Sequence, residues 1–283
     1  MFSYDEPFVA VVTGSASGIG QAIAIELASR GCRLILNTRS NVDGLMRTAQ
    51  ACQSSISREQ TVSQKPSRRP LCIVADLRSK PSLYSLADAA FAQHGYVNLW
   101  VHAAGADVLT GPAKSWSFEQ KLSELWDLDV RAMMLLSRMV AERQVRQSCS
   151  HPTLPSMIHI GWDQATQGME GDSGQYFCAI KSAVSAFSKS LAKTYAPRLR
   201  VNCISPGWIQ TEWGRGTSQA WAQRACKESL LERWGRPEDI AKVVAAISLG
   251  DGEFINAQDL AVNGGWRGAS EVVASQTTQD DRS

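Results

Sequence analysis

A tyrosine and a lysine stand five residues apart in the segment GQYFCAIKSAV, residues 174–184. A lysine one helical turn from a tyrosine lowers the pKa of the phenol and makes it a useful proton donor. Such a pair needs a spacing of four, because residues four apart differ by about 40° around a helix and residues five apart by about 140°. Tyr176 lies five before Lys181, and the residue four before it is Phe177. The spacing therefore predicts a helix that presents a lysine with no phenol beside it.

A second segment, TGSASGIG at residues 13–20, joins an apolar run to an amphipathic one. Its glycines allow a tight turn and the close approach of a phosphate to the backbone. The helix that follows presents free N–H groups and the positive end of its dipole to an anion. We therefore predict a dinucleotide pyrophosphate site here; the alternative is a turn with a structural role alone.

Apolar strands alternate with helical segments along most of the chain. The expected strands are residues 8–14, 32–38, 71–76, 98–105, 156–161, 200–205 and 259–263. The expected helices are residues 19–31, 82–94, 118–147, 174–195, 218–228 and 237–248. This alternation predicts a single-domain α/β fold: a doubly wound, Rossmann-type parallel sheet with helices on both faces.

Composition excludes several classes of function. The chain has 283 residues and a formal net charge of +2, which gives no argument for a nucleic acid or a membrane surface as partner. The seven scattered cysteines and four histidines do not show the spacing of metal ligands. The odd number and wide spacing of the cysteines favour a reduced, cytoplasmic location. The N-terminus lacks the basic flank and long apolar run of a signal or membrane anchor. We expect one domain over residues 1–266, with a polar insertion at 53–70 and a flexible tail at 267–283.

The spacing TGxxxGxG and later motifs resemble the short-chain dehydrogenase/reductase family. HAAG at 102–105 is similar to the family's NNAG motif, and RVNCISPGWIQT at 200–211 resembles its segment beside the nicotinamide. RWGRPEDIA at 233–241 and VNGG at 262–265 are similar to its C-terminal landmarks. The resemblance covers residues 7–266 and implies an oxidoreductase with a nicotinamide cofactor.

The resemblance also implies a set of cofactor-binding residues. They are Gly14, Ser15, Ser17, Gly18, Ile19, Gly20, Thr38, Arg39, Ser40, Asp76, Leu77, Ala103, Ala104, Gly105, Lys181, Pro206, Gly207, Ile209 and Thr211. Thr38 stands where NAD-specific members carry aspartate, and the guanidinium of Arg39 can pair with a 2′-phosphate. Asp76 matches the residue that faces the adenine amino group, although it can also cap the following helix. NADP(H) is therefore favoured over NAD(H).

The catalytic positions depart from the family's pattern. In the family a tyrosine moves the proton, a lysine four residues later lowers its pKa, a serine orients the carbonyl and an asparagine anchors a water. The residues at these positions here are Phe177, Lys181, Trp162 and Asp129. Asp129 can still hold a water, or it can have a helix-face or salt-bridge role instead. An indole donates one N–H but has no proton for transfer.

Two other groups are candidate proton donors. Tyr176 can serve if the helix bulges or starts late, and Asp163 can serve if burial against Trp162 raises its pKa. Each also has an ordinary structural role, packing for the tyrosine and a turn cap for the aspartate.

The substrate side is rich in tryptophan. Trp208, Trp213 and Trp221 lie in or just after the segment that forms the substrate lid in this family, and Trp162 faces the same cleft. The rings predict either a pocket for a flat or apolar ligand or ordinary packing. The resemblance further implies a homodimer or homotetramer, assembled through the helices at 118–147 and 174–195.

The leading hypothesis is an NADP(H)-dependent oxidoreductase. It would act on a small molecule with a carbonyl, a hydroxyl or a conjugated double bond, through a non-standard proton donor. The alternative is a nucleotide-binding sensor or scaffold with little or no turnover, and a lyase or isomerase with Asp163 as base is a third. The retained Lys181 favours the enzyme, and the replacements at Trp162 and Phe177 favour the sensor.

Overall fold

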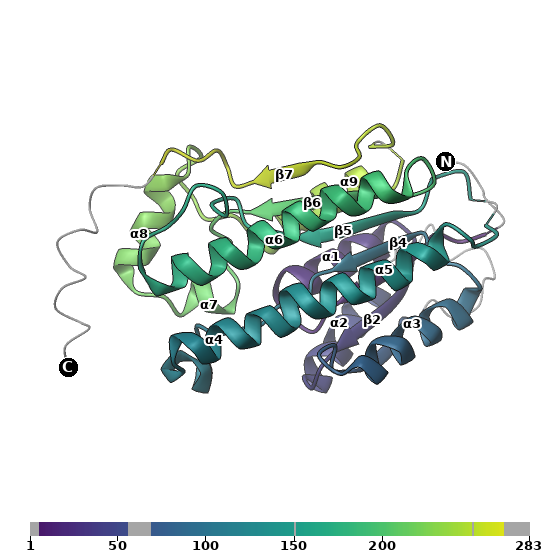
Figure 1. Ribbon diagram of the computed structural model, residues 1–283, viewed down its shortest axis with the longest axis horizontal. Helices are drawn as coiled ribbons and strands as arrows, with labels where there is room; N and C mark the ends of the chain where they lie inside the picture. The colour runs from purple at the N-terminus through teal and green to yellow at the C-terminus, as the bar shows by residue number, and fades with distance from the viewer. Residues whose placement is uncertain (1–5, 56–68, 150, 251, 269–283) are drawn as a thin grey trace.

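A seven-stranded parallel sheet forms the centre of the protein (Figure 1). The computed structural model describes residues 6–55, 69–149, 151–250 and 252–268, without the side chains of residues 213 and 215. The strands are β1 (Val9–Thr13), β2 (Arg33–Thr38), β3 (Leu71–Val74), β4 (Leu99–His102), β5 (Ser156–Ile160), β6 (Arg200–Pro206) and β7 (Asp259–Val262). Their order is β3-β2-β1-β4-β5-β6-β7, and it reverses between β1 and β4. The predicted Rossmann-type fold is confirmed, and ligands of such folds bind at this reversal point.

Helices cover both faces of the sheet. They are α1 (Gly18–Ser29), α2 (Val42–Ser54), α3 (Lys80–His94), α4 (Phe118–Leu125), α5 (Met133–Gln144), α6 (Gly171–Tyr195), α7 (Glu212–Arg215), α8 (Gln219–Glu228) and α9 (Pro237–Ser248). A 3-10 helix, η2 (Gly111–Ser115), precedes α4, and a π-helical stretch, η3 (Trp126–Ala132), joins α4 to α5. Figure 1 shows α6 and the rod made by α4 and α5 lying across the front of the sheet.

The central strands are apolar throughout because both of their faces are buried. Ala10 and Val12 of β1 pack with α1, α2 and α9 on one side, and Val9 and Val11 pack with α3, α5 and α6 on the other. All four side chains are fully buried. The strand period of two therefore divides one short apolar run between two cores.

Helix α2 adds to the set predicted from the sequence. The Asn41 side chain caps it by accepting the N–H of Gly44 at 2.9 Å. Its buried face carries small or polar side chains such as Thr48, Ala49 and Cys52, which weakens the helical apolar pattern.

Several expectations concern segments at the margin of the structure. Residues 56–68 of the 53–70 insertion and residues 269–283 of the tail lie outside the described residues. Within the described ranges no helix is long and apolar enough to cross a bilayer, and no cluster of three metal-ligating side chains occurs. The seven cysteines are all free thiols.

Candidate functional site

A cleft of about 1470 Å³ lies at the carboxyl ends of the strands, where the strand order reverses. The loops after β1, β2, β3 and β4 form one half of it, and α6 with the segments after β5 and β6 forms the other. Pockets for drug-sized ligands measure about 300–1,000 Å³, so this space can hold a dinucleotide together with a substrate.

Glycine backbone forms the narrowest part of the cleft. Gly14 has a φ of +64°, and a Cβ added there would lie 2.6 Å from Cα of Ala104. A Cβ added to Gly20 would lie 2.4 Å from the carbonyl oxygen of Gly14. Gly18, with a φ of +56°, begins α1. Strand, turn and helix therefore pack so closely here that side chains are excluded.

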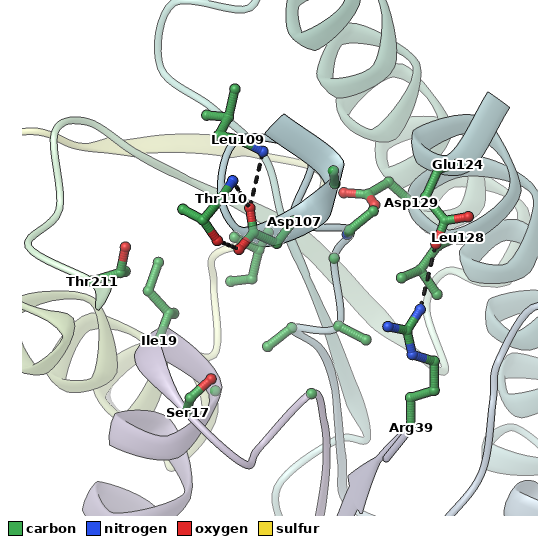
Figure 2. Close-up of a pocket in the computed structure, with 18 of the residues that line it drawn as sticks. Ser17, Ile19, Arg39, Asp107, Leu109, Thr110, Glu124, Leu128, Asp129 and Thr211 are labelled. Atoms are coloured by element: carbon green, nitrogen blue, oxygen red, sulfur yellow. Dashed lines mark hydrogen bonds and ion pairs between the residues drawn. The ribbon is translucent and has the colours of Figure 1, made fainter. Parts of the chain in front are cut away.

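The N-terminus of α1 suits an anion. Ser17 is the N-cap, yet its side chain makes no capping hydrogen bond within the described structure, and the first turn contains no acidic residue. Ser17 and Ile19 line the cleft, with Thr211 beside Ile19 (Figure 2). The first N–H groups of α1 thus remain available, and the residues present fit a pyrophosphate.

Most of the cofactor residues implied by the sequence line this cleft. Those that do so are Gly14, Ser17, Ile19, Gly20, Thr38, Arg39, Ser40, Asp76, Leu77, Ala103, Ala104, Gly105, Lys181, Pro206, Gly207, Ile209 and Thr211. Gly18 is not among the lining residues. Ser15 is fully buried beside the turn, where its hydroxyl donates to the Asn37 carbonyl and accepts the Asn37 N–H. Ser15 thereby holds the glycine turn to β2.

Four charged side chains line the far end of the cleft. Arg78 contacts the Asp76 carboxylate through Nε at 3.0 Å and Nη2 at 2.6 Å. Its Nη1 lies 2.5 Å from Oε1 of Glu124, and Nη1 of Arg39 lies 3.5 Å from the same oxygen (Figure 2). The hydrogen bonds from Arg78 lower the pKa of Asp76. Sequence reasoning missed Arg78 and Glu124; the only signal for Arg78 is its place two residues after Asp76.

A buried ion pair also lines the cleft. Nζ of Lys181 is 2.9 Å from Oδ1 of Asp129 and donates to the carbonyl of Ile160 at 3.1 Å. The other oxygen of Asp129 accepts the N–H of Ala106 at 2.8 Å. Asp129 is 3% exposed and stands in the π-helical stretch η3, a distortion that is common at functional sites. The carboxylate therefore fixes the ammonium group at the cleft wall.

Comparison with known proteins decides the family. The family described as enoyl-(acyl carrier protein) reductase matches residues 14–267. NADPH-dependent aldehyde reductase 2, chloroplastic, of Arabidopsis thaliana is 32% identical over 264 residues, which are 91% of this chain and 93% of that protein. A short-chain type dehydrogenase/reductase of Picea abies is 27% identical over 259 residues, 91% of each chain. The chain belongs to the short-chain dehydrogenase/reductase family.

A solved structure gives the same result for the fold. The short-chain dehydrogenase/reductase of Serratia marcescens superposes with a TM-score of 0.76 at 24% identity, over 91% of this chain and 97% of that one. The resemblance inferred from the motifs is thus confirmed, and the protein is a member of an oxidoreductase family.

Aromatic rings stand at the two positions that the sequence motifs predict for the family's tyrosine and serine. Phe177 and Trp162 both line the cleft, and their ring centroids lie 6.3 Å apart at 66°. Phe177 is one turn before Lys181 on the regular helix α6. The two rings form an edge-to-face contact beside the ammonium group.

Tyr176 and Asp163 do not line the cleft. Tyr176 is 2% exposed and packs against Phe118, and its pKa is raised by burial. Its hydroxyl lies 3.0 Å from the hydroxyl of Ser173, which does line the cleft. Asp163 accepts from Nδ2 of Asn263 at 2.9 Å, and burial raises its pKa to about 6.

Tryptophans line the substrate half of the cleft. Trp116, Trp162, Trp208 and Trp221 are lining residues, whereas the side chain of Trp213 lies outside the described structure. Trp208 and Trp221 stand 5.5 Å apart.

A buried ion network supports these two indoles. Nε1 of Trp208 donates to Glu228 at 2.7 Å, and Glu228 also binds Nε of Arg224 at 2.6 Å. The guanidinium of Arg224 lies over the ring of Trp221 at 4.9 Å and pairs with Glu170. These charges join α8 to the loop before α6, and sequence reasoning missed them because they come from distant segments.

Two buried histidines lie beneath the cleft at the ends of β4 and β5. Nε2 of His102 and Nε2 of His159 both contact the hydroxyl of Ser137, at 3.0 and 2.9 Å. Burial lowers the pKa of both histidines, that of His159 to about 3, so both rings are neutral. Ser188 donates to the Val184 carbonyl and must accept from Nδ1 of His159. The Ser137 hydroxyl therefore donates to His159 and accepts from His102, which ties the sheet to α5 and α6.

Proposed function

We propose that this protein is an NADP(H)-dependent oxidoreductase that reduces a carbonyl or conjugated substrate, or oxidises the corresponding alcohol, with a proton source other than the family's tyrosine. The proposal rests on two features that lie in the same cleft. A glycine-lined anion site opens at α1, and Lys181 is held at the cleft wall by Asp129.

The bound nicotinamide dinucleotide would supply the hydride. Backbone N–H groups at the start of α1 would hold its pyrophosphate, and Lys181 would hold the nicotinamide ribose. The Asp129 carboxylate restricts the lysine to a single position, which favours positioning of the cofactor over proton transfer.

The preference for NADP(H) is supported at the adenosine end. Thr38 provides no carboxylate to accept hydrogen bonds from the ribose, and it is followed by Arg39, which is 54% exposed and reaches over the cleft. A guanidinium pairs well with a phosphate. The Arabidopsis relative is named as NADPH-dependent, which agrees with this assignment.

Ser173 is our candidate for the proton donor. It lies one turn before Phe177 on α6 and therefore on the same helix face. Apart from the predicted cofactor-binding residues, the described hydroxyl-bearing side chains that line the cleft are Ser173 and Thr110, and the Thr110 hydroxyl already donates to Asp107. Ser173 is half-buried, so solvent water can replace the proton that it gives up, while the Tyr176 hydroxyl orients it through their 3.0 Å hydrogen bond.

The indoles of Trp116, Trp162, Trp208 and Trp221 favour a flat, apolar or conjugated substrate. Planar rings stack on indoles, which makes such a wall suited to a flat ligand. We propose this class of small molecule as substrate.

The same proposal includes a homodimer or homotetramer. Trp126 and Leu135 are 51% and 44% exposed on the rod formed by α4, η3 and α5. Exposed apolar groups of this size are often covered by a partner. Seven free cysteines fit a reduced compartment, and we propose the cytoplasm.

The test is to mix the protein with NADPH and a panel of aldehydes, ketones, quinones and enones, and to follow the nicotinamide absorbance. We expect oxidation of NADPH with at least one planar substrate. Ser173→Ala should lower kcat about tenfold or more with little change in NADPH affinity, and Ser173→Thr should retain most of the rate.

Two results would contradict the proposal. Tight binding of NADPH with no oxidation across the panel would leave the sensor or scaffold as the function. Absence of binding by NADPH and by NADH at millimolar concentration, in folded protein, would remove both.

A further inference from the structure

Glu124 is an acidic residue in a place where an anionic cofactor is expected. It lies near the end of α4, is 19% exposed, and lines the cleft together with Arg39, Asp76 and Arg78. One of its oxygens, Oε1, lies within ion-pair distance of both guanidinium groups, at 3.5 Å from Arg39 and 2.5 Å from Arg78.

The four charges form a closed set. Arg78 is held on one side by the two oxygens of Asp76 and on the other by Glu124. Two carboxylates and two guanidinium groups sum to zero formal charge. Arg39 reaches the cleft from the end of β2, so its contact with Glu124 crosses from the sheet to α4 (Figure 2).

A 2′-phosphate has the same preference for guanidinium groups as this carboxylate, but a larger charge of about −1.5 to −2. Glu124 repels this phosphate from Arg39 and Arg78 while it contacts both, because like charges at such distances repel. Glu124 must therefore move away or lose part of its interaction when the phosphate binds.

We infer that Glu124 is a specificity-determining residue, an internal anion that competes with the cofactor 2′-phosphate for Arg39 and Arg78. This inference deepens the proposed function and depends on it for the adenosine site. The inference implies that the Glu124 carboxylate reduces the preference for NADP(H) over NAD(H). Removal of the Glu124 charge should therefore increase that preference.

The experiment uses two nucleotides that lack the nicotinamide, 2′,5′-ADP and 5′-AMP, titrated calorimetrically into the full chain. The variant is Glu124→Gln, which keeps the side-chain size and removes the charge. The matched control is Glu119→Gln, an exposed residue on the same helix that does not line the cleft. Thermal unfolding of each variant checks that the fold is retained.

We expect Glu124→Gln to bind 2′,5′-ADP about five- to tenfold more tightly than the wild type, and 5′-AMP within about twofold of it. Glu119→Gln should match the wild type for both. The gain should diminish at high salt, because partly exposed charges are screened.

Three results would overturn the inference. Equal affinities of Glu124→Gln and wild type for 2′,5′-ADP would show that the carboxylate does not compete. A loss of 5′-AMP affinity in Glu124→Gln would show that Glu124 instead accepts hydrogen bonds from the ribose. Failure of the wild type to bind either nucleotide, NADPH or NADH would remove the adenosine site, and with it the proposed function itself; the first two results leave that function standing.

Discussion

At the start of α1 the cleft wall is made of backbone, whereas along α6 it is made of side chains. Gly14 and Gly20 cannot be replaced without a collision with Ala104 or with the turn itself. Phe177 and Trp162, by contrast, pack against each other and against neighbours that do not depend on a hydroxyl. The fold thus requires the first set of residues and accepts different residues in the second.

This difference explains how one cleft can combine a glycine turn that excludes side chains with aromatic side chains at positions 162 and 177. A change at the glycine turn costs both stability and binding, because the same close packing provides both. A change of tyrosine to phenylalanine on α6 removes one oxygen and leaves the helix and its packing intact. Chemistry can therefore be lost or altered there without loss of the fold.

The largest expected effect comes from introducing protic groups at the two predicted catalytic positions. In Phe177→Tyr combined with Trp162→Ser, the new phenol stands one turn before Lys181, and we expect carbonyl reduction by NADPH to rise about 10²–10⁴-fold. Steady-state rates on the substrate panel measure this. Trp162→Ala in place of Trp162→Ser is the control that opens the pocket without a hydroxyl. No gain in rate, with NADPH bound, would mean that more than the donor is missing.

A smaller effect is expected at the backbone-lined end. Gly18→Ala places a methyl group 3.7 Å from Cγ2 of Thr211, in the space in front of α1, and should weaken NADPH binding about tenfold to 100-fold. Gly95→Ala is the matched control, since Gly95 also has a positive φ, +79°, but ends α3 with no atom within 4 Å of the added Cβ. Both variants should lose about 1 kcal/mol of stability, but only Gly18→Ala should bind NADPH more weakly. Equal affinities for NADPH would place the pyrophosphate elsewhere.

The smallest effect concerns Asp163, whose folded pKa of about 6 exceeds its ordinary 3.8 because of burial. Between pH 3.8 and about pH 6 the folded state binds more protons than the unfolded state, so the free energy of unfolding decreases as the pH rises through this range. Above about pH 6 the full loss of stability from this group is present. Asp163→Asn should stabilise the protein at pH 7 by about 1–3 kcal/mol and should lose the advantage near pH 4.

Urea unfolding at pH 4, 5, 6 and 7 measures the Asp163→Asn effect, with the exposed Asp172→Asn on α6 as control. If the free energy of unfolding changes with pH in the same way in the wild type and in Asp163→Asn, the Asp163 carboxyl titrates normally and the expectation is wrong. In that case the burial of Asp163 carries no electrostatic penalty.

Features that depend on neighbours along the chain were predictable from the sequence. The strands, the glycine turn and the helix carrying Phe177 and Lys181 follow from periodicity and spacing, because hydrogen bonds within helices and turns act over a few residues. The family motifs then named the segments that line the cleft. The proton donor stays a prediction, because a spacing tells which face a residue occupies and not which partner it meets.

Pairings between distant segments required the tertiary structure. Arg39 and Glu124 are separated by 85 residues, Lys181 and Asp129 by 52, and Arg224 and Glu170 by 54. Charged residues are common on the surfaces of helices, so nothing in the sequence distinguishes Glu124 from Glu119. The sequence alone determined the fold and the position of the nucleotide turn; only the packing of α4, α6 and α8 around the cleft decided which charges meet, because such contacts depend on distance in space.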